Sequence, residues 1–277
     1  MLLTNEKGGT IKRLQFTYTL NAQFSAPVTH HAFSVMFLPQ DTSRQTISGL
    51  SIHISDKEDY CVSEDNFGNK KLYGLIKGTH DRFDVTISGE AQTGLDIFEE
   101  YTANPSAYAF LKAQTPLTEA GDCIRKYHRN LELEKIAGDY DKALCMMNTL
   151  HYTFTYDTEA TEVHETAENA LALGRGVCQD YAHIMLSLLR MEGIPARYVV
   201  GMTLGEGASH AWVEALCNGY WYGFDPTDNK LVNADYIRVS CGRDSSDCAV
   251  IRGNFYGCVT QRQTEKVTVS EKEQEHD

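Results

Sequence analysis

The sequence predicts an α+β protein in which a small antiparallel β-sandwich precedes a region of helices and further antiparallel strands. From Arg13 to about Thr93, apolar and polar residues alternate with a period of two, which is typical of strands with one buried face. From Ala120 onward, apolar residues recur at helical spacing. Further along, Asn218 and Gly219 separate two alternating runs and predict a tight hairpin.

Short runs of alternation, separated by polar turns, mark the strands of the predicted sandwich. They lie at 14–20, 33–37, 50–54, 71–76 and 83–87. Between about Gly94 and Ala113 the alternation fades, and Pro105 interrupts a connecting segment. We therefore predict a sandwich domain over 1–100 and a second domain over 101–277. The charged tail from about Thr264 is expected to lack order, apart from a last strand at 267–269.

The helices of the second domain follow from apolar residues on one face. Helical spacing predicts a helix over 120–127, one starting at Asp139 and a short one over 167–173, which Thr166 could cap. A longer helix begins at Cys178. Its apolar stripe consists of Ala182, Met185, Leu186 and Leu189, and Gly193 and Pro195 end it.

Composition excludes several classes of function. The formal net charge is −13, and no basic stripe could displace the counterions of a nucleic acid or bind an anionic membrane. The N-terminus lacks the apolar core of a secretion signal, which leads us to expect a cytoplasmic location. The eight cysteines include no CxxC pair, and no EF-hand-like loop is present, so we expect neither metal nor cofactor. His30 and His31 adjoin on a predicted strand and should point to opposite faces of a solvated edge.

Cys178 is the residue on which the functional prediction depends. It lies where a turn containing Gly174 and Gly176 becomes the apolar helix. A thiol in the first turn of a helix lies at the positive end of the helix dipole, which favours the reactive thiolate. A nucleophile is therefore one interpretation of Cys178, and a buried structural cysteine is the other.

The predicted hairpin gives the thiol two possible partners. With Asn218 and Gly219 as the turn, Cys217 pairs with Tyr220, so the numbers of paired residues sum to 437 and Trp212 lies opposite Asp225. His210 then lies diagonally across from Asp225 on the same face, within reach of its carboxylate. The opposite face, with residues such as Val213 and Phe224, is apolar and should be buried.

Together these residues form a thiol version of the nucleophile, base and orienter arrangement. Cys178 would attack a carbonyl carbon, His210 would act as base and then as acid, and Asp225 would orient the imidazole. Four further residues are candidates for substrate binding: Gln179, Tyr152, Tyr156 and Trp212. Gln179 and the two tyrosines could supply an oxyanion donor beside the N–H of Cys178, whereas ordinary packing is the competing interpretation for Trp212.

Three segments carry a resemblance to a known family. GRGVCQDYAHIMLSLLRMEGIPARYVVG, ASHAWVEA and GFDPTDN resemble the bacterial transglutaminase-like superfamily of cysteine proteases. The segment 237–257 and the early strands with their DNFGN turn extend the resemblance over nearly the whole chain. It implies a papain-like core, a helix packed on an antiparallel sheet, after the sandwich. It also implies that Cys178, His210 and Asp225 are nucleophile, base and orienter.

The main expectation for function is thiol-dependent hydrolysis of an amide, peptide or isopeptide bond in a peptide or protein, through an acyl-enzyme. Transamidation is the alternative, in which an amine replaces water as the acyl acceptor. A non-catalytic scaffold is the competing hypothesis from another class, because a fold does not by itself imply an activity.

Overall fold

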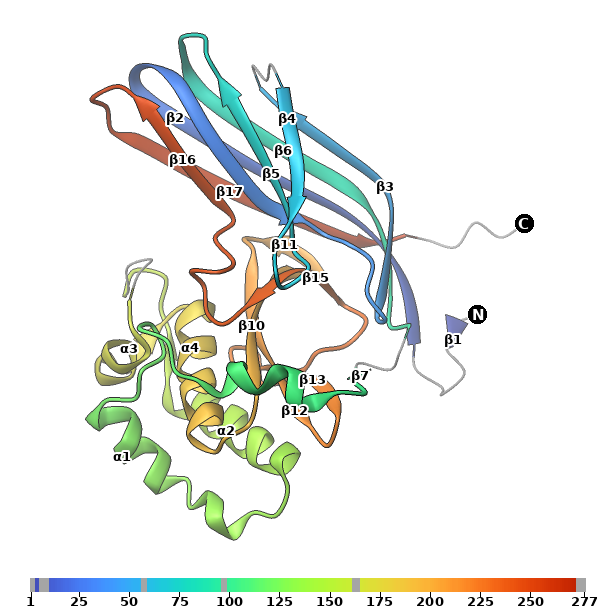
Figure 1. Ribbon diagram of the computed structural model, residues 1–277, viewed down its shortest axis with the longest axis vertical. Coiled ribbons are helices and arrows are strands. Elements are labelled where there is room, and N and C mark those ends of the chain that lie inside the picture. Colours follow the sequence, from blue (N-terminus) through green and yellow to red (C-terminus); the bar gives the residue numbers. More distant parts are fainter. Residues whose placement is uncertain (1–2, 5–9, 56–58, 96–98, 161–164, 273–277) are drawn as a thin grey trace.

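The computed structural model describes residues 3–4, 10–55, 59–95, 99–160 and 165–272. It shows two lobes along the long axis of the molecule, one made of long strands and one that contains the helices (Figure 1). This is the predicted α+β fold, an antiparallel sandwich followed by a helix-on-sheet core.

The strand lobe is organised around one strand of 29 residues, β2 (Thr10–Leu38). The first part of β2 pairs with β6 (His80–Thr93) and the last part with β5 (Lys70–Ile76), so β2 belongs to both sheets of the sandwich. The rings of Tyr18 and Phe37, one from each part, stack with centroids 3.9 Å apart. The strand therefore folds over its own core.

The remaining strands of this lobe complete two antiparallel sheets. In order, the first sheet is β11, β17, β2, β6 and β3, and the second is β16, β2, β5 and β4; the short β1 also pairs with β2. Their bounds are β1 (Leu3–Thr4), β3 (Gln45–Ile54), β4 (Asp59–Glu64), β11 (Gly205–Gly207), β16 (Ile251–Tyr256) and β17 (Gln261–Glu271).

Strands from the end of the chain therefore belong to the N-terminal lobe. The division at residue 100 stays a prediction, but β16 and β17 fall within the predicted second domain and pair with β2 instead. The predicted strand at 267–269 is present as part of β17, which continues to Glu271, so the expectation of disorder is wrong for 264–266 and 270–271. The expectation of a solvated His31 is also wrong, since its side chain lies in the sandwich core at 4% exposure.

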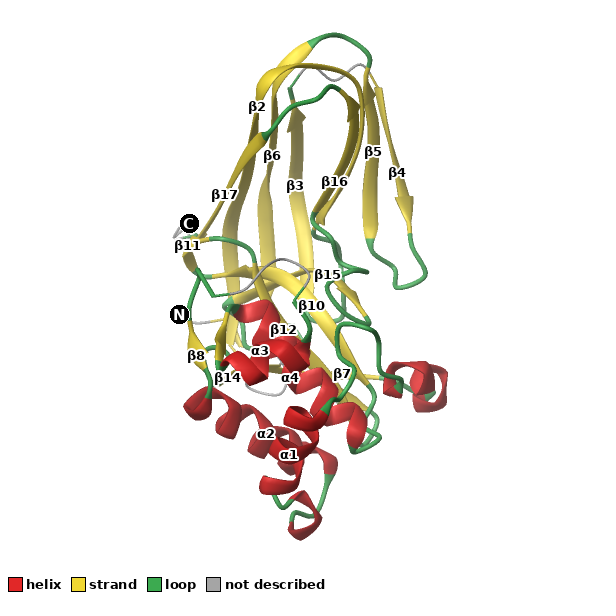
Figure 2. Ribbon diagram, turned by 90° about the vertical axis from the view of Figure 1, so that its left-hand side faces the viewer, coloured by secondary structure: helices red, strands yellow, loops and turns green. Residues whose placement is uncertain are grey.

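The helical lobe has an antiparallel sheet covered on one side by helices (Figure 2). Its strand order is β14, β13, β12, β10 and β15, and β7 pairs with β13. The bounds are β7 (Glu99–Tyr101), β10 (Ala196–Thr203), β12 (His210–Cys217), β13 (Tyr220–Asp225), β14 (Lys230–Leu231) and β15 (Tyr236–Gly242). A small parallel pair consists of β8 (Thr155–Tyr156) and β9 (Arg175–Gly176).

Among the described residues of this lobe, four α-helices lie where helical spacing predicts them. Their bounds are α1 (Asp122–Asn130), α2 (Asp139–Thr153), α3 (Ala167–Leu173) and α4 (Cys178–Met191), and two short 3-10 helices cover Pro105–Lys112 and Leu133–Lys135. Thr166 caps α3 by accepting a hydrogen bond from the N–H of Asn169 at 3.2 Å. α4 is buried almost throughout and packs on β12 and β10, which makes it the central helix of the core.

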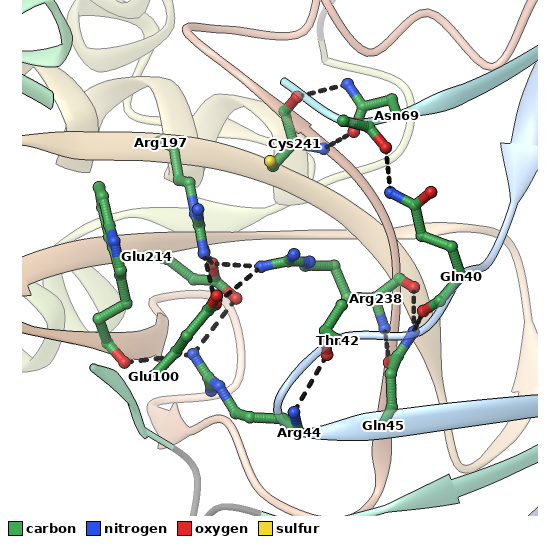
Figure 3. A network of polar contacts seen from close by, with 12 residues as sticks. Gln40, Thr42, Arg44, Gln45, Asn69, Glu100, Arg197, Glu214, Arg238 and Cys241 are labelled. Atoms are coloured by element: carbon green, nitrogen blue, oxygen red, sulfur yellow. Dashed lines mark hydrogen bonds and ion pairs between the residues drawn. The ribbon is translucent and has the colours of Figure 1, made fainter. Parts of the chain in front are cut away.

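A buried ionic cluster joins the two lobes (Figure 3). The carboxylate of Glu214 on β12 lies 2.6 Å from Arg197 Nη2 and 3.2 Å from Arg238 Nη1. Arg44, which precedes β3, approaches the same carboxylate at 3.5 Å. Burial alone would raise the pKa of Glu214, but the three guanidinium groups outweigh it and hold that pKa well below its usual range.

Two side-chain amides extend this contact along β15 (Figure 3). Gln45 donates to the carbonyl of Arg238 and accepts from its N–H, both at 2.8 Å. Asn69 does the same with Cys241, at 2.7 and 2.8 Å. Each side-chain amide hydrogen-bonds a backbone N–H and C=O at the buried edge of β15, as a neighbouring strand would. These bonds fix β15 to the sandwich.

Candidate active site

Cys178 begins α4 because the turn before it is capped by a side chain. Asp180 accepts a hydrogen bond from the N–H of Val177 at 2.8 Å, which satisfies a backbone donor at the helix start. Gly176 is required for this cap, since a Cβ there would lie 2.3 Å from Asp180 Oδ2. The thiol of Cys178 is partly exposed at the positive end of a 14-residue helix.

The register of the hairpin formed by β12 and β13 confirms the prediction. Cys217 pairs with Tyr220 and Val213 with Phe224. Asn218 and Gly219 have φ values of 53° and 85°, the left-handed conformation that a two-residue turn of this kind needs. The predicted apolar face packs beneath α4, as β12 makes the largest set of contacts with that helix. His210 and Asp225 are thereby brought to the other face.

The carboxylate of Asp225 is fully buried and is held by four hydrogen bonds. Its Oδ2 lies 2.7 Å from His210 Nε2 and accepts from the hydroxyl of Tyr236 at 2.8 Å. Its Oδ1 accepts from the N–H groups of Thr227 and Asp228 at 3.0 and 3.2 Å. Since Nε2 of His210 is engaged by Asp225, Nδ1 is the ring nitrogen that can serve Cys178.

The two partners shift the protonation of His210 in one direction. Burial alone would lower the pKa of His210, but hydrogen bonds to Asp225 and Cys178, together with their charges, raise that pKa to about 10. Burial would raise the pKa of Asp225, and its bonds to His210 and Tyr236 lower it instead. At neutral pH the pair is therefore an imidazolium beside a carboxylate, which is the state that stabilises a neighbouring thiolate.

A cleft of about 600 Å³ opens over Cys178 and His210. Its floor comes from the core, including Gln179 beside the thiol. The opposite side comes from the C-terminal strands, with Ile251 and Arg252 on β16 and Gln263 and Glu265 on β17. The remaining lining residues are Tyr198, Val200, Ser209, Ala211, Ser245, Ser246, Cys248, Ala249 and Val250. The cleft therefore lies between the two lobes.

The other substrate-binding candidates lie at different distances from this cleft. Tyr156 is half-exposed, and burial and then the charge of Cys178 raise its pKa. Tyr152 is 79% exposed, its ring packs on His151, and it is not among the residues that line this cleft. Trp212 is 1% exposed and packs edge-on against Tyr236, so it supports the carboxylate side of the site from within.

Several residues of the site escaped the sequence argument. Tyr236 binds Asp225 from β15, and Ser209 and Glu265 bind each other at the entrance to β12. Tyr236 shares its alternating run with ordinary core residues, so nothing singled it out. Glu265 did carry a signal, because it occupies the position where the apolar alternation of Val269 and Val267 would continue.

Metal and membrane sites were also considered over the described part of the chain. No three His, Cys, Asp or Glu side chains among the described residues gather as metal ligands would. No helix within the described ranges is long and apolar enough to cross a membrane. The cytoplasmic location and the lack of a cofactor stay predictions.

The fold and the cleft define a class of protein with a papain-like core behind an N-terminal sandwich. Residues 127–226 match the Transglutaminase-like superfamily, and residues 14–92 match the Bacterial transglutaminase-like N-terminal region. The chain belongs to the transglutaminase-like superfamily, and it carries the bacterial N-terminal region in front of the core.

Relatives and a solved structure are similar to most of the chain. An uncharacterized protein of Mycobacterium leprae is 27% identical over 88% of this chain and 94% of its own length. An uncharacterized protein of Mycobacterium tuberculosis is 25% identical over 88% of each. The crystal structure of a Cytophaga hutchinsonii protein, whose name proposes a cysteine protease, superposes with a TM-score of 0.77 at 19% identity, covering 97% of this chain and 93% of that one. That likeness concerns the fold.

Proposed function

We propose that the chain is a thiol hydrolase that cleaves an amide, peptide or isopeptide bond through an acyl-enzyme on Cys178. The observation that carries the proposal is that His210, which lines the same cleft as Cys178, lies 2.7 Å from the buried carboxylate of Asp225. The raised pKa of His210 supports it further, because an imidazolium facing a thiol favours the thiolate. The name of the Cytophaga hutchinsonii protein suggests the same chemistry.

The residues would act in two half-reactions. The Cys178 thiolate attacks the carbonyl carbon of the scissile amide, and His210 gives its proton to the leaving amine as the C–N bond breaks. Neutral His210 then takes a proton from water, whose oxygen attacks the thioester, and the acid leaves as the Cys178 thiolate and the imidazolium form again. Asp225 keeps the ring oriented through Nε2 and stabilises the positive charge in both halves.

The oxyanion that forms in each half-reaction needs hydrogen-bond donors. The N–H of Cys178 is free of the helix ladder because it belongs to the first turn of α4, and it is one donor in this proposal. Gln179, which follows Cys178 and lines the cleft, is the second. Tyr156 is its competitor, because the charge of Cys178 contributes to its raised pKa.

Site-resolved alkylation tests the nucleophile without knowledge of the substrate. Limited iodoacetamide at neutral pH, followed by peptide mapping, should label Cys178 faster than the exposed Cys258, which serves as the internal control. His210→Ala should slow labelling of Cys178 and leave Cys258 unchanged. Equal labelling of both cysteines in the wild type would contradict the proposal.

The acyl acceptor is tested separately. We propose water, as the cleft is open between the lobes. A glutamine-containing peptide is incubated with a labelled primary amine, and hydrolysis and amine incorporation are measured together. Incorporation well above hydrolysis would replace the hydrolase with a protein-glutamine transamidase. A peptide library turned over by the wild type and not by Cys178→Ala would define the substrate, whereas a Cys178→Ala variant that leaves every cellular effect intact would point to a scaffold role.

A further inference from the structure

We propose that Glu265 on the C-terminal strand β17 is a positioning residue for His210 and acts through Ser209. The inference rests on the function proposed for the Cys178 site. It implies that the N-terminal lobe, to which β17 belongs, helps to position the active-site histidine.

The contact is direct and uses both donors of one residue. Glu265 Oε1 accepts a hydrogen bond from the N–H of Ser209 at 2.9 Å and another from its hydroxyl at 2.8 Å. Oε2 of the same carboxylate accepts from the hydroxyl of Tyr18 on β2, at 3.3 Å. Hydrogen bonds to a charged acceptor are the stronger kind. Ser209 directly precedes His210, so the position of its backbone determines the position of the His210 Cα, from which the imidazole extends.

The position of Glu265 on its strand is unusual for a carboxylate. Along β17, Val269 and Val267 point into the sandwich and are 2% exposed. Glu265 is the next residue of the same alternation, opposite the buried Leu20. Placing a charge on that face is costly unless it is hydrogen-bonded. The carboxylate is thus retained where the inward face of β17 meets the cleft.

The chain that leads into His210 depends on β17 for its path. Residues 205–207 form β11, which pairs with β17, with Gly205 opposite Val269 and Gly207 opposite Val267. All three residues of β11 are exposed. The Ser209 contact is the last anchor of this segment before β12 begins. It therefore fixes the backbone at the entrance to the catalytic strand.

His210 is then held at two independent points. Asp225 fixes the ring through Nε2, and the Ser209 anchor fixes the backbone from which the ring extends. Losing the ring contact would change the protonation of His210. Losing the backbone anchor would leave that contact in place but widen the range of positions of Nδ1 relative to the thiol. A displacement of about 1 Å is enough to lower a rate by orders of magnitude.

The test compares three variants of the full chain by the rate at which iodoacetamide alkylates Cys178, measured from acid to alkaline pH. Glu265→Ala removes both hydrogen bonds and should lower the rate near neutral pH by about tenfold, with the rise of the pH profile moved toward that of an ordinary thiol. Glu265→Gln keeps an oxygen that can accept from Ser209 and should restore most of the rate. Glu271→Ala, on the same strand and exposed, is the matched control and should behave as the wild type.

The position of the pH profile is the decisive readout, because a general loss of stability would not shift it. A Glu265→Ala profile that superposes on the wild type, or a Glu265→Gln variant as slow as Glu265→Ala, would overturn the inference. Should Glu265→Ala not fold, Ser209→Ala removes only the hydroxyl contact and should give a smaller shift in the same direction; no shift would overturn the inference. Loss of the proposed function looks different, since wild-type Cys178 would then show no dependence on His210 at all, and both proposals would fall.

Discussion

Two pairs of sequence-adjacent strands build this site: β12 and β13 form a hairpin, whereas β16 and β17 each pair with β2. The hairpin of β12 and β13 closes through two residues, and its register follows from Asn218 and Gly219 alone. The strands β16 and β17 are also adjacent in sequence, but each pairs with β2, more than 200 residues earlier in the chain. The hairpin of β12 and β13 is local and carries His210 and Asp225. The strands β16 and β17 depend on long-range pairing and carry the opposite wall of the cleft.

The difference suggests that local and long-range strand pairing serve different purposes in this site. Local pairing fixes chemical groups to one another, because few residues separate them and the turn defines their offset. Long-range pairing fixes the two lobes to each other and so determines the shape of the cleft between them. A change in the local hairpin should therefore affect the chemistry first, whereas a change in β16 or β17 should affect stability first.

The largest effect is expected from Asp225→Ala, in the local hairpin. It removes the partner of His210 Nε2 and leaves the donors of Tyr236, Thr227 and Asp228 unsatisfied. Reactivity or turnover at Cys178 should fall by roughly a thousandfold, by analogy with the orienting carboxylate of other triads. The measurement is the alkylation rate of Cys178, with the unfolding free energy followed in urea.

Tyr236→Phe is the control for that prediction. It removes one hydrogen bond to Asp225 and keeps the bond between Asp225 and His210. A loss of about 1 kcal/mol in the unfolding free energy with a small change in rate is expected. Equal losses of alkylation rate in Asp225→Ala and Tyr236→Phe would contradict this prediction. The hydroxyl of Tyr236 would then matter as much for the reactivity of Cys178 as the contact between Asp225 and His210.

The second prediction concerns β17 and its long-range pairing with β2. Val267→Asp places a carboxylate on the inward face of β17, at a position that is 2% exposed and opposite Tyr18. The unfolding free energy should fall by about 3–5 kcal/mol, because a charge is buried without a partner. Ser270→Asp, on the same strand and exposed, should leave it within about 0.5 kcal/mol. Similar urea midpoints for the two variants would show that β17 is dispensable.

The same contrast explains what the sequence could predict. The local hairpin, α4 and the meeting of His210 with Asp225 all follow from patterns within a few tens of residues, and each is present in the structure. The pairing of β16 and β17 with β2 has no local signature, because an alternating sequence predicts a strand but not the strand with which it pairs. Glu265 looked like part of a charged tail for the same reason. Its role becomes visible only when Ser209 lies beside it.

The third prediction uses pH to weaken the support of β16 without touching the local hairpin. His31 on β2 lies beside Phe255 of β16, and its Nδ1 is 3.2 Å from His80 Nε2. Burial, and then the charge of His80, lower the pKa of His31 from 6.5 to about 4. His31 is therefore protonated below pH 6.5 in the unfolded chain, but only below about pH 4 in the folded chain.

Stability should be complete above pH 6.5 and should fall as the pH drops toward 4, by up to about 3 kcal/mol. Urea unfolding between pH 4 and 8 measures it, and His31→Phe should remove much of the slope. His210 has the opposite sign, because its raised pKa of about 10 keeps its contribution complete below pH 6.5 and removes it as the pH rises from 6.5 toward 10. A slope that is unchanged in His31→Phe would assign the acid sensitivity to other groups.

The smallest effect is expected at the turn of the local hairpin. Gly219 has φ of 85°, and an added Cβ would meet its nearest atom, in the Tyr101 ring, at 3.6 Å, which is ordinary contact. The cost of Gly219→Ala is therefore backbone strain alone, about 1 kcal/mol in the unfolding free energy. Asn218→Gly, at φ of 53°, should cost nothing measurable. Because the register is also held by β10 on one side and β7 on the other, the alkylation rate of Cys178 should stay at its wild-type value. A slower rate in Gly219→Ala at unchanged stability would mean that the turn itself sets the distance from His210 to Asp225, and that the local hairpin is less rigid than its pairing implies.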